Sequence, residues 1–308
     1  MSMEVTFLGT SGAVPTPKRN PLGILLRREG QRILLDVGEG IQRQMMKFNT
    51  GFGLDHVVIT HLHGDHYYGL PGLLETLEFN ERERSLTIHV PARRTRRVTE
   101  FIDVTIGEPA FPILINGLEP GDVAIDHDEY TLEAVEVDHE TEAIGIALIE
   151  TDRPGRFDKP RALELGVPEG PKFGQLQRGE TVELADGTLV EPDEVLGPPR
   201  PGRRIVYSGD TRPTNSIETA ARDADLLIHE ATFGDDRAER AAETGHSTAR
   251  QAGQLAERAE AKQLALVHTS SRYAGERDRL HSEAAEAFSG ETILPDDGDT
   301  MSVPYPSE

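Results

Sequence analysis

Residues 61–66 read His-Leu-His-Gly-Asp-His and place three imidazoles and a carboxylate at the end of the apolar run 55–60. Such polar groups cannot all be buried without partners, and imidazole nitrogens with one carboxylate oxygen form a good zinc site. The two alternating histidines are expected to point to one side. The aspartate and the last histidine follow a glycine, where the chain can turn toward a second ion. The stretch therefore predicts a metal site at a strand end, rather than a surface histidine cluster with no ligand.

Three later strand-like segments each end on a further potential ligand. The first ends on His139, the second reaches Asp210 just after a glycine, and the third ends on His268. Taken singly, each residue would more often be a capping or turn residue than a ligand. Taken with 61–66 they favour a metal site, because one segment alone supplies too few ligands for two ions.

Strand-like and helix-like segments alternate in both halves of the chain, which predicts the α/β class. The expected strands are 5–8, 23–26, 32–36, 55–60, 86–90, 144–149, 204–207, 225–229 and 263–267, with others around 113 and 135. The expected helices are 41–48, 70–77, 247–260 and a short one near 283–288. Residues 152–200 differ, since prolines and glycines crowd a stretch with few apolar runs, and we expect an inserted arm or long loop there.

The 308 residues carry 54 acidic side chains against 32 lysines and arginines, a formal net charge of −22, and contain no cysteine. Few of the cations are lysines, which suggests a protein kept soluble in concentrated salt; an ordinary acidic cytosolic protein is the alternative. The charge argues against a nucleic-acid partner unless the binding face is local. Disulfides and thiolate chemistry are excluded. Since no long apolar run or N-terminal leader is present, we expect a cytoplasmic protein with no membrane partner.

The 61–66 motif resembles the HxHxDH signature of the metallo-β-lactamase superfamily, and His139, Asp210 and His268 fall where its later ligand motifs fall. Further stretches resemble motifs of one of its families, the short-form ribonuclease Z family of tRNA 3′-processing endonucleases. They are PTPKRN at 15–20, YSGDT at 207–211, HEAT at 229–232, HST at 246–248 and HTSSRY at 268–273. The resemblance implies one αβ/βα sandwich domain over 1–308, with a flexible tRNA-binding arm, the exosite, inserted at 152–200.

The same resemblance implies two Zn²⁺ ions per subunit and assigns their ligands. One ion would be held by His61, His63 and His139, the other by Asp65, His66 and His268, with Asp210 bridging the two. It also implies that Asp65 accepts a proton from the attacking water, and that His246, fixed by Glu230, donates one to the departing oxygen. For His246 a duller alternative is a residue beside a helix cap.

RNA contacts follow from the resemblance as well. Lys18, Arg19 and Asn20 are expected to contact the RNA 3′ end or to shape the cleft, and Arg272 to bind substrate. Gly170 and Pro171 match the glycine–proline segment of the arm, which grips precursor tRNA in this family while the other subunit of a homodimer cuts. The cleavage would leave a 3′-OH on the tRNA and a 5′-phosphate on the trailer.

Two basic stretches bear on RNA binding. In the arm, six cations oppose five carboxylates over 152–180, which predicts a weakly basic surface with a disordered linker as the alternative. Six arginines between 82 and 97 lie among three glutamates. They could track phosphates or form a solvated helix face, and the sequence favours neither.

Two other functions remain open at the sequence level. A small-molecule phosphodiesterase or arylsulfatase would use the same metal site without needing the arm or the 15–20 loop. A non-catalytic RNA-binding or scaffold protein would be expected to have lost ligands, whereas here the set is complete.

Overall fold

A computed structural model describes residues 2–306 and divides the chain into two compact units. The first unit comprises residues up to Ile149 and Arg204–Pro304. The second comprises Glu150–Arg203 with the residues from Tyr305 onward, and we call it the arm. Among the described residues, no helix combines the length and the apolar character needed to cross a membrane.

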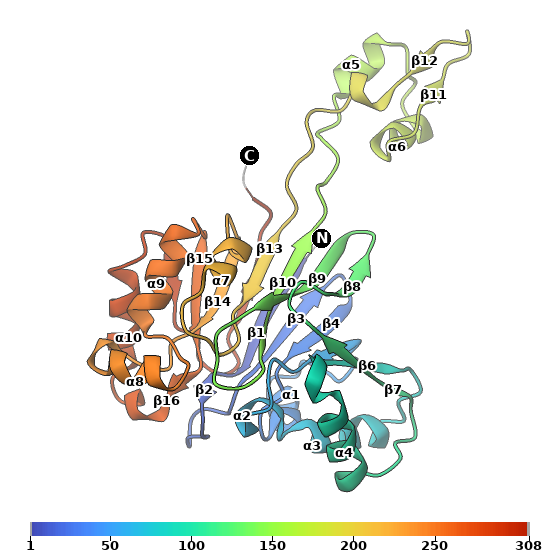
Figure 1. Cartoon of the computed structure of the whole chain (residues 1–308). Coiled ribbons are helices and arrows are strands. Elements are labelled where there is room, and N and C mark those ends of the chain that lie inside the picture. Colours follow the sequence, from blue (N-terminus) through green and yellow to red (C-terminus); the bar gives the residue numbers. More distant parts are fainter. Residues whose placement is uncertain (1, 307–308) are drawn as a thin grey trace. The chain divides into compact units, whose positions relative to one another are not determined.

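Two seven-stranded sheets form the centre of the first unit (Figure 1). In spatial order, one sheet contains β18 (Thr300–Ser302), β1 (Met3–Gly9), β3 (Gly23–Arg28), β4 (Gln31–Leu35), β5 (His56–Val58), β6 (Leu86–Pro91) and β7 (Ile113–Leu118). The other contains β17 (Glu291–Ile293), β15 (Gln263–Val267), β14 (Leu226–Glu230), β13 (Arg204–Tyr207), β10 (Ile144–Glu150), β9 (Tyr130–Glu136) and β8 (Val123–His127). A short parallel pair, β2 (Ser11–Gly12) and β16 (Thr269–Ser270), lies apart from both sheets.

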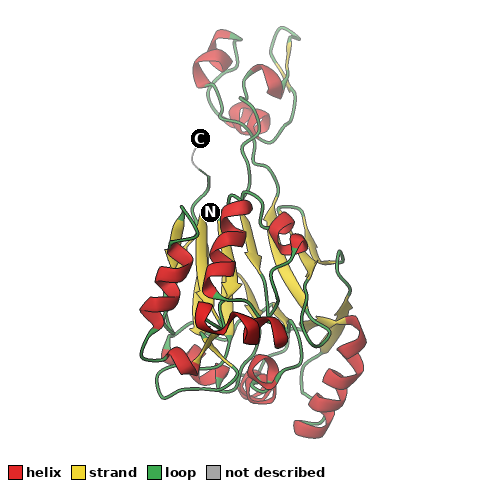
Figure 2. Cartoon of the chain, turned by 60° about the vertical axis from the view of Figure 1, so that its left-hand side comes forward, coloured by secondary structure: helices red, strands yellow, loops and turns green. Residues whose placement is uncertain are grey.

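Helices cover the outer face of each sheet (Figure 2). The helices in the part of the chain that forms the first sheet are α1 (Ile41–Lys47), α2 (Gly64–Tyr67), α3 (Leu70–Phe79), η1 (Ala92–Arg94) and α4 (Thr95–Thr105). Those in the part of the chain that forms most of the second sheet are α7 (Asn215–Ala220), η3 (Asp235–Arg237), α8 (Ala238–Glu243), α9 (Ala249–Arg258), η4 (Ser271–Tyr273) and α10 (Arg277–Ala285). The predicted αβ/βα sandwich is confirmed, and the short C-terminal helix begins several residues earlier than expected.

Alternation along the strands builds three apolar layers in the first unit. In β14, Leu226 and Ile228 face the core between the two sheets, whereas Leu227 packs under α9 and α10. β13, β14 and β15 run parallel and are buried on both faces, so they read as continuous apolar runs. This rigid frame carries the polar residues that follow the strand ends.

A row of three polar side chains, with the buried His89 at its centre, crosses the first sheet away from these ends. The His89 ring nitrogens lie 3.1 Å from His56 Nδ1 and 3.1 Å from Asn116 Nδ2. Burial, reinforced by the neighbouring His56, lowers the pKa of His89 to about 4. The folded protein therefore holds His89 in its neutral form.

This row predicts an acid-sensitive free energy of unfolding. Between pH 6.5 and 4 the unfolded chain binds the His89 proton and the folded chain does not, so stability falls as pH falls, by about 3 kcal/mol. We expect His89→Gln to lose less stability than wild type between pH 7 and pH 4.5 in urea unfolding. The exposed His127 gives the matched control, His127→Gln, and equal pH slopes for His89→Gln and wild type would contradict the prediction.

The arm is folded and has a small core of its own. Its elements are α5 (Lys159–Glu164), α6 (Pro171–Gln177), β11 (Val182–Glu183), β12 (Leu189–Val190) and η2 (Pro192–Glu194). Its buried apolar residues are Ala162, Val167, Leu176, Val182, Val190 and Val195. The expectation of a long loop missed these elements, because helices of six or seven residues contribute few apolar positions to a periodic pattern.

Aromatic and ionic contacts hold the two ends of the arm's chain together. Arg203 forms a buried ion pair with Glu150, with Nη2 2.7 Å from Oε1. The guanidinium carbons of Arg153 and Arg203 lie 3.5 and 4.0 Å from the centre of the Tyr305 ring.

The net charge of the arm differs from the prediction. The weakly basic surface predicted from residues 152–180 is wrong for the whole segment, since 152–200 holds seven cations against ten carboxylates.

Candidate metal centre

The polar residues that follow five strands come together in one cluster. They are His61 after β5, His139 after β9, Asp210 after β13 and His268 after β15, together with Glu230 at the end of β14, which lies 2.9 Å from His246. An isolated bridge between Asp138 and Arg212 brings the segment after β9 beside that after β13. Grouping of polar side chains at carboxyl strand ends is the usual origin of sites in open α/β sheets.

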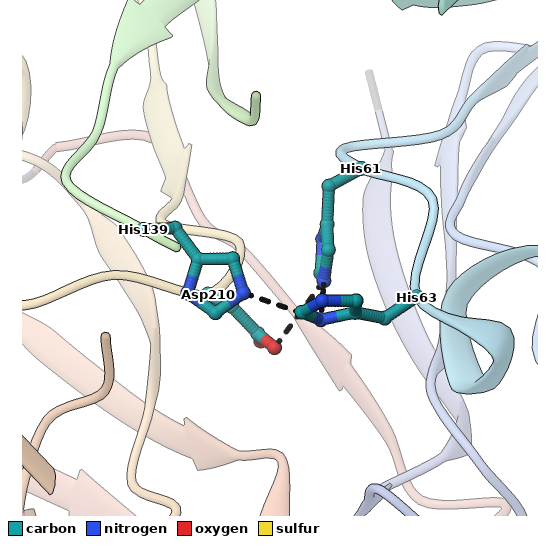
Figure 3. A group of neighbouring side chains, drawn as sticks. All are labelled: His61, His63, His139 and Asp210. Atoms are coloured by element: carbon teal, nitrogen blue, oxygen red, sulfur yellow. Dashed lines mark hydrogen bonds and ion pairs between the residues drawn. The ribbon is translucent and has the colours of Figure 1, made fainter. Parts of the chain in front are cut away.

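One group consists of His61, His63, His139 and Asp210, whose inward nitrogen and oxygen atoms all lie within 4.8 Å of one another (Figure 3). His63 Nδ1 is 3.0 Å from His61 Nε2 and 3.3 Å from His139 Nε2. Asp210 Oδ2 is 3.6 Å from His61 Nε2. Three imidazole nitrogens thus point at one position beside a carboxylate.

A second group consists of Asp65, His66 and His268. Asp65 Oδ2 lies 3.0 Å from His268 Nε2 and 3.6 Å from His66 Nε2. Asp210 Oδ2 lies 3.3 Å from both of these nitrogens. The same Asp210 oxygen therefore borders both groups, and a carboxylate in that position can serve two ions.

In four of these histidines, the ring nitrogen that points away from the ligand cluster has a hydrogen-bond partner. The partners are Thr60 Oγ1 for His61 at 3.1 Å, Asp36 Oδ2 for His66 at 2.9 Å, the Gly245 carbonyl for His139 at 2.8 Å and Thr232 Oγ1 for His268 at 2.8 Å. Partners of this kind orient an imidazole and set which nitrogen is left for a ligand. The inward nitrogens are therefore available as electron-pair donors.

Asp36 anchors this outer layer. Its carboxylate accepts hydrogen bonds from the Thr60 amide at 2.8 Å and from the Tyr207 hydroxyl at 2.6 Å, and it faces His66. The residue is completely buried and has a left-handed backbone, φ 57°. Asp36 thus links one strand end of each sheet to a histidine of the cluster.

The donor set fits metal cations. Among the described residues, His66 Nε2 and Asp210 Oδ1 are buried without a hydrogen-bond partner, which is costly unless another group binds them. Burial and its histidine neighbours hold the pKa of His61 well below its usual value, so this imidazole is neutral, as a ligand must be. Burial opposes charge on His66, but Asp210 and Asp36 outweigh it and raise the pKa of His66. The pocket at His66 thus favours a positive charge, as a metal ion would supply.

His246 lies beside the second group and is held by Glu230. Its Nδ1 is 2.9 Å from Glu230 Oε1 and 3.9 Å from Asp210 Oδ2. Burial opposes charge on His246, but Glu230 and Asp210 raise its pKa to about 9. Glu230 also accepts hydrogen bonds from the backbone amides of Thr211 and Thr232, which orient its carboxylate. The geometry also allows a third potential ligand group of Asp210, His246 and His268.

Comparison with known proteins identifies the family of the chain. A protein of Natronomonas pharaonis named ribonuclease Z is 57% identical over 308 residues, covering all of both chains. The ribonuclease Z of Methanosarcina acetivorans is 44% identical and covers 99% of this chain and 100% of the relative. The chain belongs to the ribonuclease Z family. It is accordingly an endoribonuclease by family.

One solved structure agrees with the ribonuclease Z assignment, and other matches are to proteins and domains with different names. The crystal structure of human tRNase Z, short form, superposes with a TM-score of 0.71 and 27% identity, covering 98% of this chain and 100% of that one. The metallo-β-lactamase fold protein YhfI from Bacillus subtilis has a TM-score of 0.71 at 19% identity and shares the fold. Residues 3–100 match the model described as anti-Pycsar protein Apyc1, and residues 178–269 match the beta-lactamase superfamily domain.

The 15–20 loop of this ribonuclease Z family member is held mainly by the C-terminal tail. The Arg19 guanidinium pairs with Asp296 and donates to Thr10 Oγ1. The buried Asn20 donates its amide to the Glu39 carbonyl. Both side chains are thus engaged within the protein, which favours the alternative that they shape the cleft. Lys18 is exposed.

Asp297 connects that loop to the metal-site residues. Its carboxylate accepts hydrogen bonds from Thr10 Oγ1 at 2.9 Å and from the backbone amide of Asn20 at 2.7 Å. A little further along the same segment, the Ala13 amide donates to Asp65 Oδ2 at 2.6 Å. The acidic tail, which carries no recognised motif, therefore supports the segment that holds Asp65.

The other candidate RNA contacts lie farther along the chain. Arg272 is exposed in η4, four residues after His268. Pro171 is the first residue of α6 in the arm, and Gly170 precedes it as the N-cap, with a φ of 134° that residues with side chains rarely adopt. Within the 82–97 stretch, Arg84, Arg94 and Arg96 pair with carboxylates, so only part of its charge is free for RNA.

Sequence reasoning missed Asp36 and Thr232 as supporting residues. Asp36 ends the strand-like run 32–36, so it too is an acidic residue at a strand end. Thr232 lies within the HEAT motif, and its hydroxyl reaches both Glu230 and His268. The strand-end rule that found Asp210 would have found Asp36 if it had been applied to every strand.

Proposed function

We propose that the chain is a zinc-dependent endoribonuclease that removes the 3′ trailer from precursor tRNA. The products would be a tRNA ending in 3′-OH and a trailer beginning with 5′-phosphate. The observation that carries the proposal is the pair of ligand groups that share Asp210, in a chain of the ribonuclease Z family. Relatives named ribonuclease Z and the solved human tRNase Z support tRNA as the substrate.

Two zinc ions suit the proposed ligands. One ion would be held by His61, His63 and His139, and the other by Asp65, His66 and His268. Asp210 would be shared by the two. These five imidazoles and two carboxylates match the ligand preference of zinc. When bound, paired zinc ions lower the pKa of a water and neutralise charge on a phosphoryl group.

Asp65 would orient the attacking water by accepting its hydrogen bond. The Ala13 amide and His268 fix the carboxylate, with Oδ2 2.6 and 3.0 Å from their nitrogens. Burial raises the pKa of Asp65. The charge of His66 and the contacts of His268 outweigh this effect, so the pKa of Asp65 lies well below its usual value. Asp65 is therefore ionised and preoriented before substrate arrives.

His246 would donate the proton that the departing 3′ oxygen of the tRNA needs. Glu230 and Asp210 keep the ring protonated at neutral pH, since its pKa is raised to about 9. A sugar hydroxyl is a poor leaving group as an alkoxide, so a positioned acid contributes about 10²–10⁴-fold to its departure.

The arm would bind the tRNA body, and the enzyme would act as a homodimer in which one subunit clamps the substrate that the other cuts. The cations of its first half are gathered on and beside α5 and α6, whereas the second half is acidic. Contact with RNA is therefore proposed for the α5–α6 half, around Gly170 and Pro171.

The test is cleavage of an end-labelled precursor tRNA that carries a 3′ trailer, read on a sequencing gel beside Asp65→Ala. We expect one metal-dependent cut near the discriminator base that leaves 3′-OH, lost at least about 1,000-fold in the variant. Bis(p-nitrophenyl) phosphate is run in parallel. A wild-type enzyme that hydrolyses this ester but leaves precursor tRNA intact would overturn the tRNA assignment and favour the small-molecule phosphodiesterase.

A further inference from the structure

An exposed aromatic side chain stands beside the metal cluster without a role in it. Only two aromatic residues are exposed in the described part of the chain, Tyr68 at 58% and Phe79 at 87%. Tyr68 follows α2, whose first residues are Gly64, Asp65 and His66. A single exposed ring is common on protein surfaces, so what singles out Tyr68 is its position three residues after Asp65.

The Tyr68 ring lies against the backbone of the metal motif. A Cβ atom built on Gly64 would come within 2.3 Å of a ring carbon of Tyr68, so the side chain covers that glycine, between His63 and Asp65. The ring is braced by Tyr67, at 4.9 Å between ring centres, and by Phe101, at 6.4 Å. It is thus an exposed aromatic surface, in contact with neighbouring rings, within one helical turn of Asp65.

The surroundings of the ring match a site for unpaired RNA. Arg97, exposed on α4, lies beside the Tyr67 hydroxyl, so a cation for a phosphate accompanies the aromatic ring. The exposed Val14, 51% accessible, follows the Ala13 amide that holds Asp65, and adds an apolar side chain near the same carboxylate. Aromatic rings next to arginines are how proteins hold single-stranded nucleic acid without reading its sequence.

We propose that Tyr68 is a stacking platform for an unpaired nucleobase next to the scissile phosphate, an inference that rests on the proposed function. The trailer side of a precursor tRNA is single-stranded, so its bases are free to stack. Stacking contributes affinity that does not depend on counterion release, unlike phosphate contacts, which weaken steeply with salt. The acidic, lysine-poor composition suggests a protein kept soluble in concentrated salt, and in such salt Tyr68 would retain its contact with RNA while the contact of Arg97 with phosphate weakens.

The experiment compares wild type, Tyr68→Ala, Tyr68→Phe and the matched surface control Phe79→Ala at 0.2 and 2 M KCl. We expect Tyr68→Ala to raise the KM for precursor tRNA at least about fivefold at both salt concentrations, with kcat nearly unchanged, as the loss of one stacked base predicts. Tyr68→Phe should restore the wild-type KM because the ring and not the hydroxyl stacks, and Phe79→Ala should match wild type. Hydrolysis of bis(p-nitrophenyl) phosphate should be equal in all four proteins.

A fluorescent base locates the contact. With 2-aminopurine at the first trailer nucleotide, or at the nucleotide before the cut, mixing with wild type or Phe79→Ala in a stopped-flow instrument should quench fluorescence before cleavage. Tyr68→Ala should not quench it. An unchanged KM in Tyr68→Ala, or a Tyr68→Phe protein as weak as the alanine variant, overturns the proposal.

Failure of the proposed function is distinguishable from failure of this inference. If wild type does not cut precursor tRNA, the same four proteins are titrated with a short single-stranded RNA that carries 2-aminopurine. If Tyr68→Ala alone binds this RNA more weakly, the stacking role of Tyr68 is supported although tRNA is not the substrate. If all four proteins bind it equally, the stacking role is refuted.

Discussion

Replacing Asp210 by alanine is expected to abolish cleavage of precursor tRNA, by at least about 1,000-fold in kcat/KM. Asp210 is buried, and its Oδ2 lies 3.3 Å from both His66 Nε2 and His268 Nε2 and 3.6 Å from His61 Nε2. The substitution removes the one carboxylate common to both ligand groups and the anion that opposes their positive charge. Bound metal, measured by atomic emission after gel filtration, should therefore fall together with activity.

Asp225 provides the matched control for Asp210. It is also a buried aspartate of the second sheet, where it accepts the Arg204 amide at 2.8 Å and Lys262 Nζ at 2.6 Å, at the opposite end of β14 from Glu230. Asp225→Ala should lower the free energy of unfolding by about 1–3 kcal/mol and retain metal and kcat at 25 °C. Full metal content with activity within tenfold of wild type in Asp210→Ala would refute the bridging role.

Much of the fold and of the metal cluster was predictable because both depend on local pattern. Apolar runs that end on a histidine or an aspartate identify a buried strand and its polar end in the same few residues. Strands of α/β sheets gather their carboxyl ends, so His139, Asp210 and His268 could be grouped with residues 61–66 before any distance was known. The ligand distances that the structure adds are consistent with that grouping.

The strand-end rule could have placed Asp36 near the site, but the contacts of the supporting residues could not be predicted from sequence, because they join segments that lie far apart in the chain. Asp297 reaches Thr10 and Asn20 across nearly the whole chain, and Asp36 receives the Tyr207 hydroxyl from the other sheet. An acidic residue near the end of an acidic chain gives no local sign of such a contact. The charge of the arm was predicted wrongly because the count covered only residues 152–180, whereas the rest of the arm is acidic.

His246→Ala is expected to separate proton donation from metal binding. For precursor tRNA the variant should lose about 10²–10⁴-fold in kcat, because the departing 3′ oxygen has lost its acid. For bis(p-nitrophenyl) phosphate the loss should be within about tenfold, because nitrophenolate leaves without a proton and so needs no general acid. His281, which lies on α10 and contacts the Thr292 carbonyl, gives the control His281→Ala, which should leave both activities unchanged.

Metal content decides between the two roles that the geometry allows for His246. As an acid it can be removed without loss of the ions, whereas as a ligand with Asp210 and His268 it cannot. Glu230→Gln should follow His246→Ala, losing far more activity on tRNA than on the nitrophenyl ester, because Glu230 maintains the charge of the ring at 2.9 Å. Equal losses on both substrates, together with lost metal, would make His246 a ligand and leave the departing oxygen to be protonated by another group.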